Sequence, residues 1–231
     1  MLALSACTSA TVRAGHARLA RSAQPMSRSA VAAPARRAPR RPARAAARSA
    51  ARMLFGFGAP PPPQAAVTDR CFLDVVILSP NGREKYPVGR LELALFGDAA
   101  PACVARFKQL VSPDGSTPPP LKGVSFHRTL KDFIVQSGKL PDARPFAPFA
   151  AEKNGLVHLP GSLSMSQDEA ALCTSEFFVA VRAAPECDGL YTVFGQATAG
   201  MKEVINDINK RAGSADGAPW ASYEIASCGL L

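Results

Sequence analysis

The sequence predicts a mainly β domain, either a barrel or a sandwich, that carries two helices. Beyond residue 68, short apolar runs of strand type are separated by Gly and Pro. Only two segments space their apolar residues as a helix does, and helices do not alternate with strands as they would in a βαβ fold. Many short strands with two isolated helices are typical of barrels and sandwiches.

The first elements are a hairpin and a helix. Residues 72–78 are expected to form a strand, which a Pro-Asn-Gly turn at 80–82 connects to a second strand over 89–95. Pro101 then opens a helix. Its apolar residues fall on one face at helical spacing: Cys103, Val104, Phe107, Leu110 and Val111.

Short strands and one more helix follow. The second helix has its apolar residues at the spacing i, i+3, i+4, i+7: Met201, Val204, Ile205 and Ile208. The remaining strand-type runs lie over 125–127, 133–136, 162–165, 176–181, 192–196 and 221–228.

The N-terminal region differs in composition from the rest of the chain. Residues 1–53 are mostly Ala, Arg, Ser and Pro, which bury too little apolar surface to offset the entropy of ordering. This Arg-rich, acid-free composition is shared by mitochondrial and chloroplast transit peptides, and the alternative is a basic tail that is retained. We therefore expect a disordered transit peptide over 1–53, a Pro-rich linker over 54–68 and one domain over 69–231.

The positive charge of the chain belongs to this leader. The net charge is +9, but residues 1–68 contain eleven arginines and no Asp, Glu or Lys. The rest of the chain therefore has 16 basic against 18 acidic residues. A nearly neutral body lacks the clustered basic surface that phosphate binding needs, so we expect no nucleic-acid partner.

Cysteine spacing and hydropathy exclude further classes of protein. The six cysteines form no Cys-x-x-Cys pair and no short Cys/His cluster, so we expect no metal and no cofactor. Five remain if Cys7 leaves with the leader, and an odd number suits a reducing compartment. No apolar run approaches the roughly 20 residues of a transmembrane helix.

Specific residues carry a resemblance to a known family. Phe-His-Arg at 126–128, followed by Phe-x-x-Gln-x-Gly at 133–138, resembles the signature of the cyclophilins. Further matches follow in the family's order at 161–165, 175–178, 188–195, 200–201 and 228–229. The resemblance covers about 160 residues, and it implies a closed eight-stranded antiparallel β-barrel with a helix at each end.

The family catalyses rotation about X–Pro peptide bonds, so the resemblance also implies an isomerase site. Arg128 matches the catalytic arginine, and Gln136 matches the glutamine that binds the peptide and orients this arginine. Phe133, Ile134 and Phe178 match positions that line the proline slot. The alternative for these three is that they are barrel core.

Other positions match the substrate-binding rim. Gln167 matches a position whose backbone holds the substrate, and His127 is either a rim residue or a packed histidine. Three rim positions depart from the usual residues: Glu176 replaces glutamine, Cys187 replaces leucine and Tyr191 replaces histidine. Glu186 also stands where many cyclophilins have a pocket tryptophan.

Two functions follow from this pattern. The first is an active peptidyl-prolyl cis/trans isomerase that assists folding of proline-containing clients. The second is a weakly active or inactive proline-binding or assembly module, which the two glutamates favour. We expect a monomer in the chloroplast stroma, with thylakoid association or a mitochondrial location as alternatives.

Overall fold

The computed structural model describes residues 61–112, 119–141, 146–213 and 217–231. The expected transit peptide over 1–53 lies outside the described residues, as does the part of the linker before residue 61. In the described part of the chain, no helix is long and apolar enough to cross a membrane.

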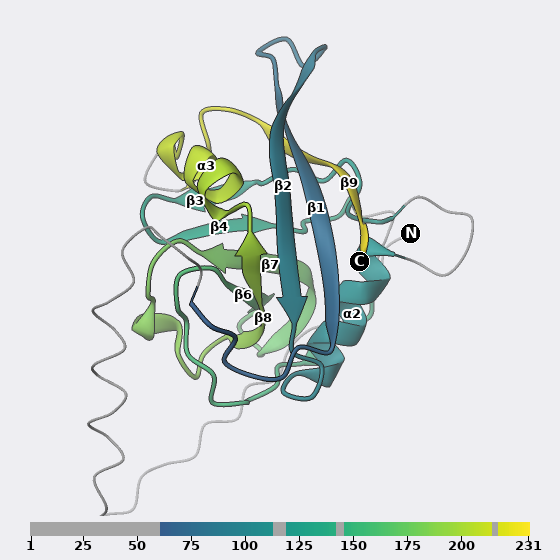
Figure 1. The fold of residues 1–231 in the computed structure, drawn as a ribbon, viewed down its shortest axis with the longest axis vertical. Helices are drawn as coiled ribbons and strands as arrows, with labels where there is room; N and C mark the ends of the chain where they lie inside the picture. Colours follow the sequence, from purple (N-terminus) through teal and green to yellow (C-terminus); the bar gives the residue numbers. More distant parts are fainter. Residues whose placement is uncertain (1–60, 113–118, 142–145, 214–216) are drawn as a thin grey trace, which may run out of the picture. The chain divides into compact units, whose positions relative to one another are not determined.

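The described residues form a strongly curled antiparallel sheet with helices beside it (Figure 1). The sheet order is β3-β4-β7-β6-β8-β2-β1-β9, and the short strand β5 pairs only with β7. The strands are β1 (Asp69–Leu78), β2 (Lys85–Leu95), β3 (Arg128–Leu130), β4 (Ile134–Ser137), β5 (Phe149–Ala150), β6 (Ser162–Gln167), β7 (Leu172–Ala180), β8 (Thr192–Ala199) and β9 (Tyr223–Leu230).

The expected β class and the eight antiparallel strands are confirmed, but the paired strands follow an open path from β3 to β9. An isolated bridge joins Ser125 to Glu224 of β9. The Phe126 amide also donates to the Tyr223 carbonyl at 3.0 Å. The run over 125–127 was expected to be a strand, but the ladder with β4 begins only at Arg128. The residues before Arg128 pair with β9 through this isolated bridge instead.

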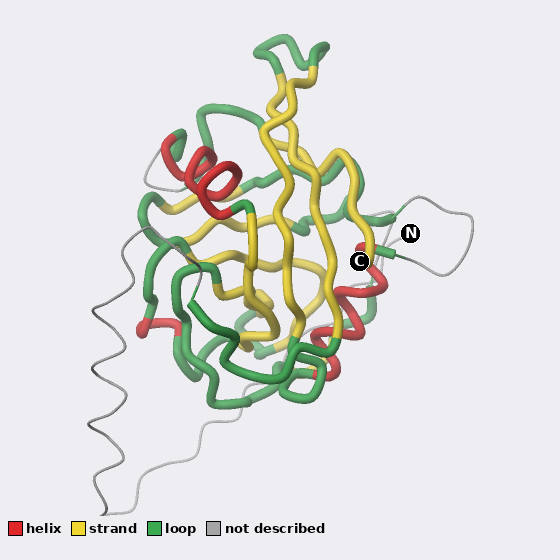
Figure 2. The backbone as a smooth tube through the Cα atoms, in the orientation of Figure 1, coloured by secondary structure: helices red, strands yellow, loops and turns green. Residues whose placement is uncertain are grey.

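Two helices contact different parts of the sheet. Helix α2 (Pro101–Val111) packs on β7, β8 and β9, and it buries the five apolar residues that the sequence places on one face. The second helix begins as a π-helical turn, η3 (Met201–Ile205), and continues as α3 (Asn206–Lys210) near β3 and β4. A short 3₁₀ turn, η2 (Pro185–Cys187), follows β7. Figure 2 shows the helices at opposite ends of the curled strands.

The core lies between the inner face of the sheet and α2. Phe107 of the helix contacts Phe177 of β7 edge to face, with ring centroids 5.1 Å apart, and packs on Phe194 of β8 at 5.2 Å. Strand side chains alternate between faces. Phe177 and Val135 therefore belong to the core cluster, while their neighbours Phe178 and Gln136 point away from it.

The chain ahead of β1 is held against the domain, and we call residues 61–68 the N-terminal strap. Pro61 is buried, and its carbonyl accepts a hydrogen bond from Gln196 Nε2. Gln64 makes two hydrogen bonds to the backbone of Val157, one as donor at 2.8 Å and one as acceptor at 3.1 Å. Residues that the sequence suggests as a linker thus make specific contacts with the sheet and its loops.

Candidate active site

Three of the sequence-predicted site residues lie in one row across neighbouring strands. Arg128 of β3 is paired with Gln136 of β4, and Gln136 is paired with Phe178 of β7. Directly opposite residues of antiparallel strands point to the same face, with Cβ atoms about 4.5–5.5 Å apart. The strand register therefore places a guanidinium, a carboxamide and an aromatic ring side by side on the outer face.

A chain of polar contacts runs from Arg128 to His127. Arg128 Nη1 donates to Gln136 Oε1 at 3.4 Å, and Gln136 Nε2 donates to Glu176 Oε2 at 2.7 Å. Gln136 Nε2 also lies 3.3 Å from Ser166 Oγ, and His127 Nε2 lies 3.4 Å from Glu176 Oε2. Because a carboxylate only accepts, Glu176 fixes the amide of Gln136 with its oxygen toward Arg128.

The environment of Glu176 keeps its carboxylate ionised. The hydrogen bond and charge of His127 lower the pKa of Glu176 from its usual range, and Gln136 and Lys139 add to this effect. Burial opposes the shift but does not outweigh it. The site therefore contains a carboxylate two hydrogen bonds from the guanidinium of Arg128.

Apolar side chains lie beside this polar chain. Phe178 is almost fully buried, stacks on His158 with centroids 5.9 Å apart, and contacts the edge of Tyr191 at 5.3 Å. Ile134 is 6% exposed and, like Phe178, does not belong to the core cluster. These residues form an apolar surface on the same face as Arg128 and Gln136.

Glu186, which replaces the pocket tryptophan of many cyclophilins, forms an ion pair. Arg182 Nη2 lies 2.5 Å from Glu186 Oε1. The guanidinium of Arg182 also lies over the Phe133 ring, 5.0 Å from its centroid. A cation thus covers one of the three residues that match the proline slot.

The remaining predicted residues lie nearby in the fold. Cys187 is buried at the end of η2, and burial raises the pKa of its thiol to about 11. It is therefore protonated at neutral pH and is no nucleophile. Gln167 ends β6, where its Oε1 atom is buried and has no hydrogen-bond partner in the described part of the chain.

Three further residues of the site carry no signal in the sequence. The ring of His158 stacks on Phe178, and its Nδ1 lies 2.9 Å from Asp188 Oδ1. Gly217 has a φ of +90° and approaches the side chain of Arg128, so that a Cβ atom there would lie 2.8 Å from Arg128 Cγ. Arg182 is the third. All three depend on contacts between segments far apart in the chain.

Within the described residues, no cluster of His, Cys, Asp or Glu is arranged to hold a metal ion. The site instead combines a fixed cation, a polar side chain of defined orientation and an apolar surface. Such a site can bind an apolar ring and donate hydrogen bonds to an adjacent amide without covalent chemistry.

Comparison with known proteins gives one family. The model of the cyclophilin-type peptidyl-prolyl cis-trans isomerases matches residues 83–230, which is more than half of the chain. A relative named peptidyl-prolyl cis-trans isomerase 9, from Caenorhabditis elegans, is 29% identical over 180 residues. The aligned region covers 72% of this chain and 56% of that relative.

Other curated relatives have similar identities. The protein of the same name from Caenorhabditis briggsae is 28% identical over 181 residues, covering 72% of this chain and 56% of the relative. The NK-tumor recognition protein of Mus musculus is 28% identical over 176 residues, covering 70% of this chain but 12% of the relative. The chain thus spans about half the length, or less, of these relatives.

Proposed function

Since the chain belongs to the family of cyclophilin-type peptidyl-prolyl cis-trans isomerases, we propose that its domain catalyses rotation about X–Pro bonds of client proteins. The observation that carries this proposal is the row of Arg128, Gln136 and Phe178 on one face of three neighbouring strands. The proposal needs a cation, an orienting amide and an apolar surface together, and the row supplies one of each.

The chemistry follows from the barrier to rotation. Amide resonance sets a barrier of about 18–20 kcal/mol, and the proline nitrogen loses its planarity when the bond is twisted. The pyrrolidine ring packs against Phe178, Ile134 and Phe133. Arg128 then donates to the amide in its twisted form, and this interaction is stronger than in the planar ground state. Gln136 holds the guanidinium and one edge of the peptide.

The fold supports this arrangement if the curled sheet closes. We include closure in the proposal because Gly123, Val124 and Phe126, ahead of β3, hydrogen-bond to β9 at the other end of the strand path. A closed barrel holds β3 and β4 in fixed register with β7.

The test is an isomerisation assay of the full-length protein with a proline-containing peptide. Replacing Arg128 with Ala should lower kcat/KM by about 100-fold, which corresponds to about 2.7 kcal/mol of transition-state stabilisation. Arg83→Ala, at the exposed turn between β1 and β2, is the matched control and should retain the rate of the unmodified protein. Equal rates for Arg128→Ala and Arg83→Ala would remove Arg128 from the mechanism.

A second candidate is a proline-binding module with little turnover. The Arg182–Glu186 ion pair favours it, because it stands where many cyclophilins have a pocket tryptophan and covers Phe133 with a cation. Binding of the peptide by calorimetry, together with no measurable isomerisation by the unmodified protein, would support this candidate over the first.

We further propose that the leader directs the protein to the chloroplast stroma, where it acts as a monomer on proline-containing clients. The support is the eleven arginines without acids or lysines over residues 1–68. The near balance of charge beyond the leader supports the absence of a nucleic-acid partner. A fluorescent fusion found in mitochondria or in the cytosol would overturn the location, and the mass in solution tests the monomer.

A further inference from the structure

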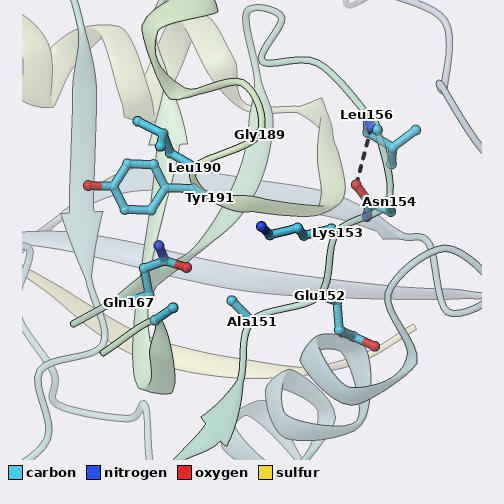
Figure 3. A pocket seen from close by; sticks show the side chains of 11 residues that line it. Ala151, Glu152, Lys153, Asn154, Leu156, Gln167, Gly189, Leu190 and Tyr191 are labelled. Atoms are coloured by element: carbon cyan, nitrogen blue, oxygen red, sulfur yellow. Dashed lines mark hydrogen bonds between the residues drawn. The ribbon is translucent and has the colours of Figure 1, made fainter. Parts of the chain in front are cut away.

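A cavity adjoins the candidate active site. It has a volume of about 200 Å³ and lies between the loop over 151–156, the loop over 189–191 and the end of β6 (Figure 3). Gln167 and Tyr191 line it, and both also match the substrate-binding rim. A peptide bound in the row of Arg128, Gln136 and Phe178 therefore passes next to this cavity, since Tyr191 contacts Phe178.

Two charged residues line the cavity, and only one of them is free to bind a ligand. The carboxylate of Glu152 accepts the backbone N–H groups of Ala102 and Cys103, at 3.0 and 2.9 Å, in the first turn of α2. Lys153 has no hydrogen bond or ion pair within the described residues. Figure 3 shows the ammonium group of Lys153 extending into the cavity toward Tyr191, while Glu152 turns toward the helix.

The neighbouring acids form no ion pair with Lys153 within the described residues. The Oδ1 atom of Asp168 accepts the N–H groups of Ala170 and Leu172, at 2.9 and 2.8 Å. The Oδ1 atom of Asp188 accepts the His158 backbone N–H at 2.8 Å and contacts its ring. Backbone N–H groups thus hold the carboxylates of Asp168 and Asp188, so the ammonium of Lys153 remains available for a ligand.

A second polar group faces the same space. Gln167 Oε1 is buried without a partner in the described part of the chain, and Figure 3 shows its amide directed into the cavity. A buried acceptor without a donor is costly, and a bound peptide can supply that donor through a backbone N–H.

We propose that this cavity is a subsite for an acidic residue of the client close to the proline. The client's carboxylate pairs with Lys153, and a backbone N–H of the client donates to Gln167 Oε1. The inference rests on the proposed isomerase function and adds a substrate class to it. A basic residue at the same place is disfavoured because it brings two like charges together.

The size of the preference follows from the exposure of Lys153. Lys153 is exposed, and exposed ion pairs contribute modestly, so we expect an acidic residue to raise kcat/KM about three- to fivefold over alanine. The preference should weaken as salt is raised, because salt screens charges near the surface.

The experiment compares peptides that carry Glu, Ala or Lys at one position at a time. The positions varied are the two before the proline and the two after it. The full-length protein should prefer Glu at one position by about threefold or more, and Lys153→Gln should reduce the Glu/Ala ratio to about one. Lys153→Glu should invert the order, so that the Lys peptide becomes the best of the three. Lys202→Gln in η3 is the matched control and should keep the preference of the unmodified protein.

The outcomes separate this inference from the proposed function. If the full-length protein isomerises the Ala peptides but shows no preference for Glu at any position, the subsite is wrong and the isomerase proposal stands. If it isomerises none of them, the proposed function fails. Calorimetric binding of the same peptides then tests the subsite independently, and equal affinity of Glu and Lys peptides would overturn it.

Discussion

At the scale of single residues, Glu176 connects the histidine and the glutamine of the site. Its pKa is lowered mainly by its hydrogen bond to His127, with smaller contributions from Gln136 and Lys139. The carboxylate is therefore kept ionised by a neighbour that belongs to the family signature. A glutamine, the usual residue at this position in the family, has both a donor and an acceptor. It therefore does not impose one orientation on Gln136, whereas the carboxylate of Glu176 does.

The contribution of His127 can be measured directly. The carboxyl of Glu176, followed by carbon NMR as pH is lowered, should titrate below its usual value of 4.5. In His127→Phe the midpoint should rise, because the largest cause of the lowered pKa is removed. Lys139→Gln is the matched comparison and should raise the midpoint less. An equal midpoint in the unmodified protein and in His127→Phe would contradict the assigned contact.

Gly217 acts on the site through Arg128. Its carbonyl accepts the Thr129 N–H at 2.7 Å, and a Cβ atom there would lie 2.8 Å from Arg128 Cγ and 3.2 Å from Leu130 Cδ2. An alanine at this position therefore displaces the arginine as well as straining the backbone.

Replacement of Gly217 with Ala should lower kcat/KM by about tenfold, since small displacements of positioned groups are costly in catalysis. Gly82→Ala is the control. Gly82 has a φ of +70° but no atom within 4 Å of the added Cβ. This variant should therefore lose about 1 kcal/mol of stability to backbone strain and keep its activity. If both variants keep full activity while losing stability equally, Gly217 has no positioning role.

At the scale of elements, the N-terminal strap is joined to the wall of the site. Gln64 holds both backbone groups of Val157, and the next residue, His158, stacks on Phe178. Val157 and His158 therefore connect the strap to Phe178 in the apolar surface of the site.

Loss of the Gln64 side chain should loosen this wall. In Gln64→Ala the Val157 amide should exchange with solvent faster, and the unfolding free energy should fall by about 1 kcal/mol for the lost hydrogen bonds. Gln109→Ala, an exposed residue of α2, is the matched control and should leave Val157 exchange unchanged. Unchanged exchange in Gln64→Ala would show that the strap does not hold the wall.

At the scale of the whole molecule, a buried histidine couples stability to pH. The ring of His158 is fully buried, and burial lowers its pKa from 6.5 although Asp188 opposes the shift. The folded protein therefore resists protonation, whereas the unfolded chain takes up a proton as pH falls through about 6.5. The unfolded state gains stability from that proton, so the unfolding free energy decreases as pH is lowered below this value.

Urea unfolding at pH 7.5, 6.5 and 5.5 tests the prediction. The unmodified protein should lose stability across this series, and the loss should be smaller in His158→Asn, which retains a donor toward Asp188 but has no ring to protonate. The carboxyls with lowered pKa, Asp69 and Glu176, lose their contribution only below about pH 4.5, outside this window. An identical decrease in both proteins would exclude His158 as the cause.

The sequence by itself determined the features that depend on local pattern. The buried face of α2, the hairpin of β1 and β2 and the second helix follow from periodicity and turn residues, and the structure has all three. The signature around Arg128, together with the ordered matches that follow it along the chain, predicted the family, which the match over residues 83–230 shows. The roles of the individual site residues stay predictions.

The tertiary structure alone decided which distant segments meet. The two-residue strand β5, the strap on Val157, the His158 ring beneath Phe178 and the cavity around Lys153 have no local signature. Hydrophobic periodicity records how one segment faces the core, because each strand or helix buries a face of its own. It does not record which loop packs beside which strand, because that pairing depends on the register and curl of the whole sheet.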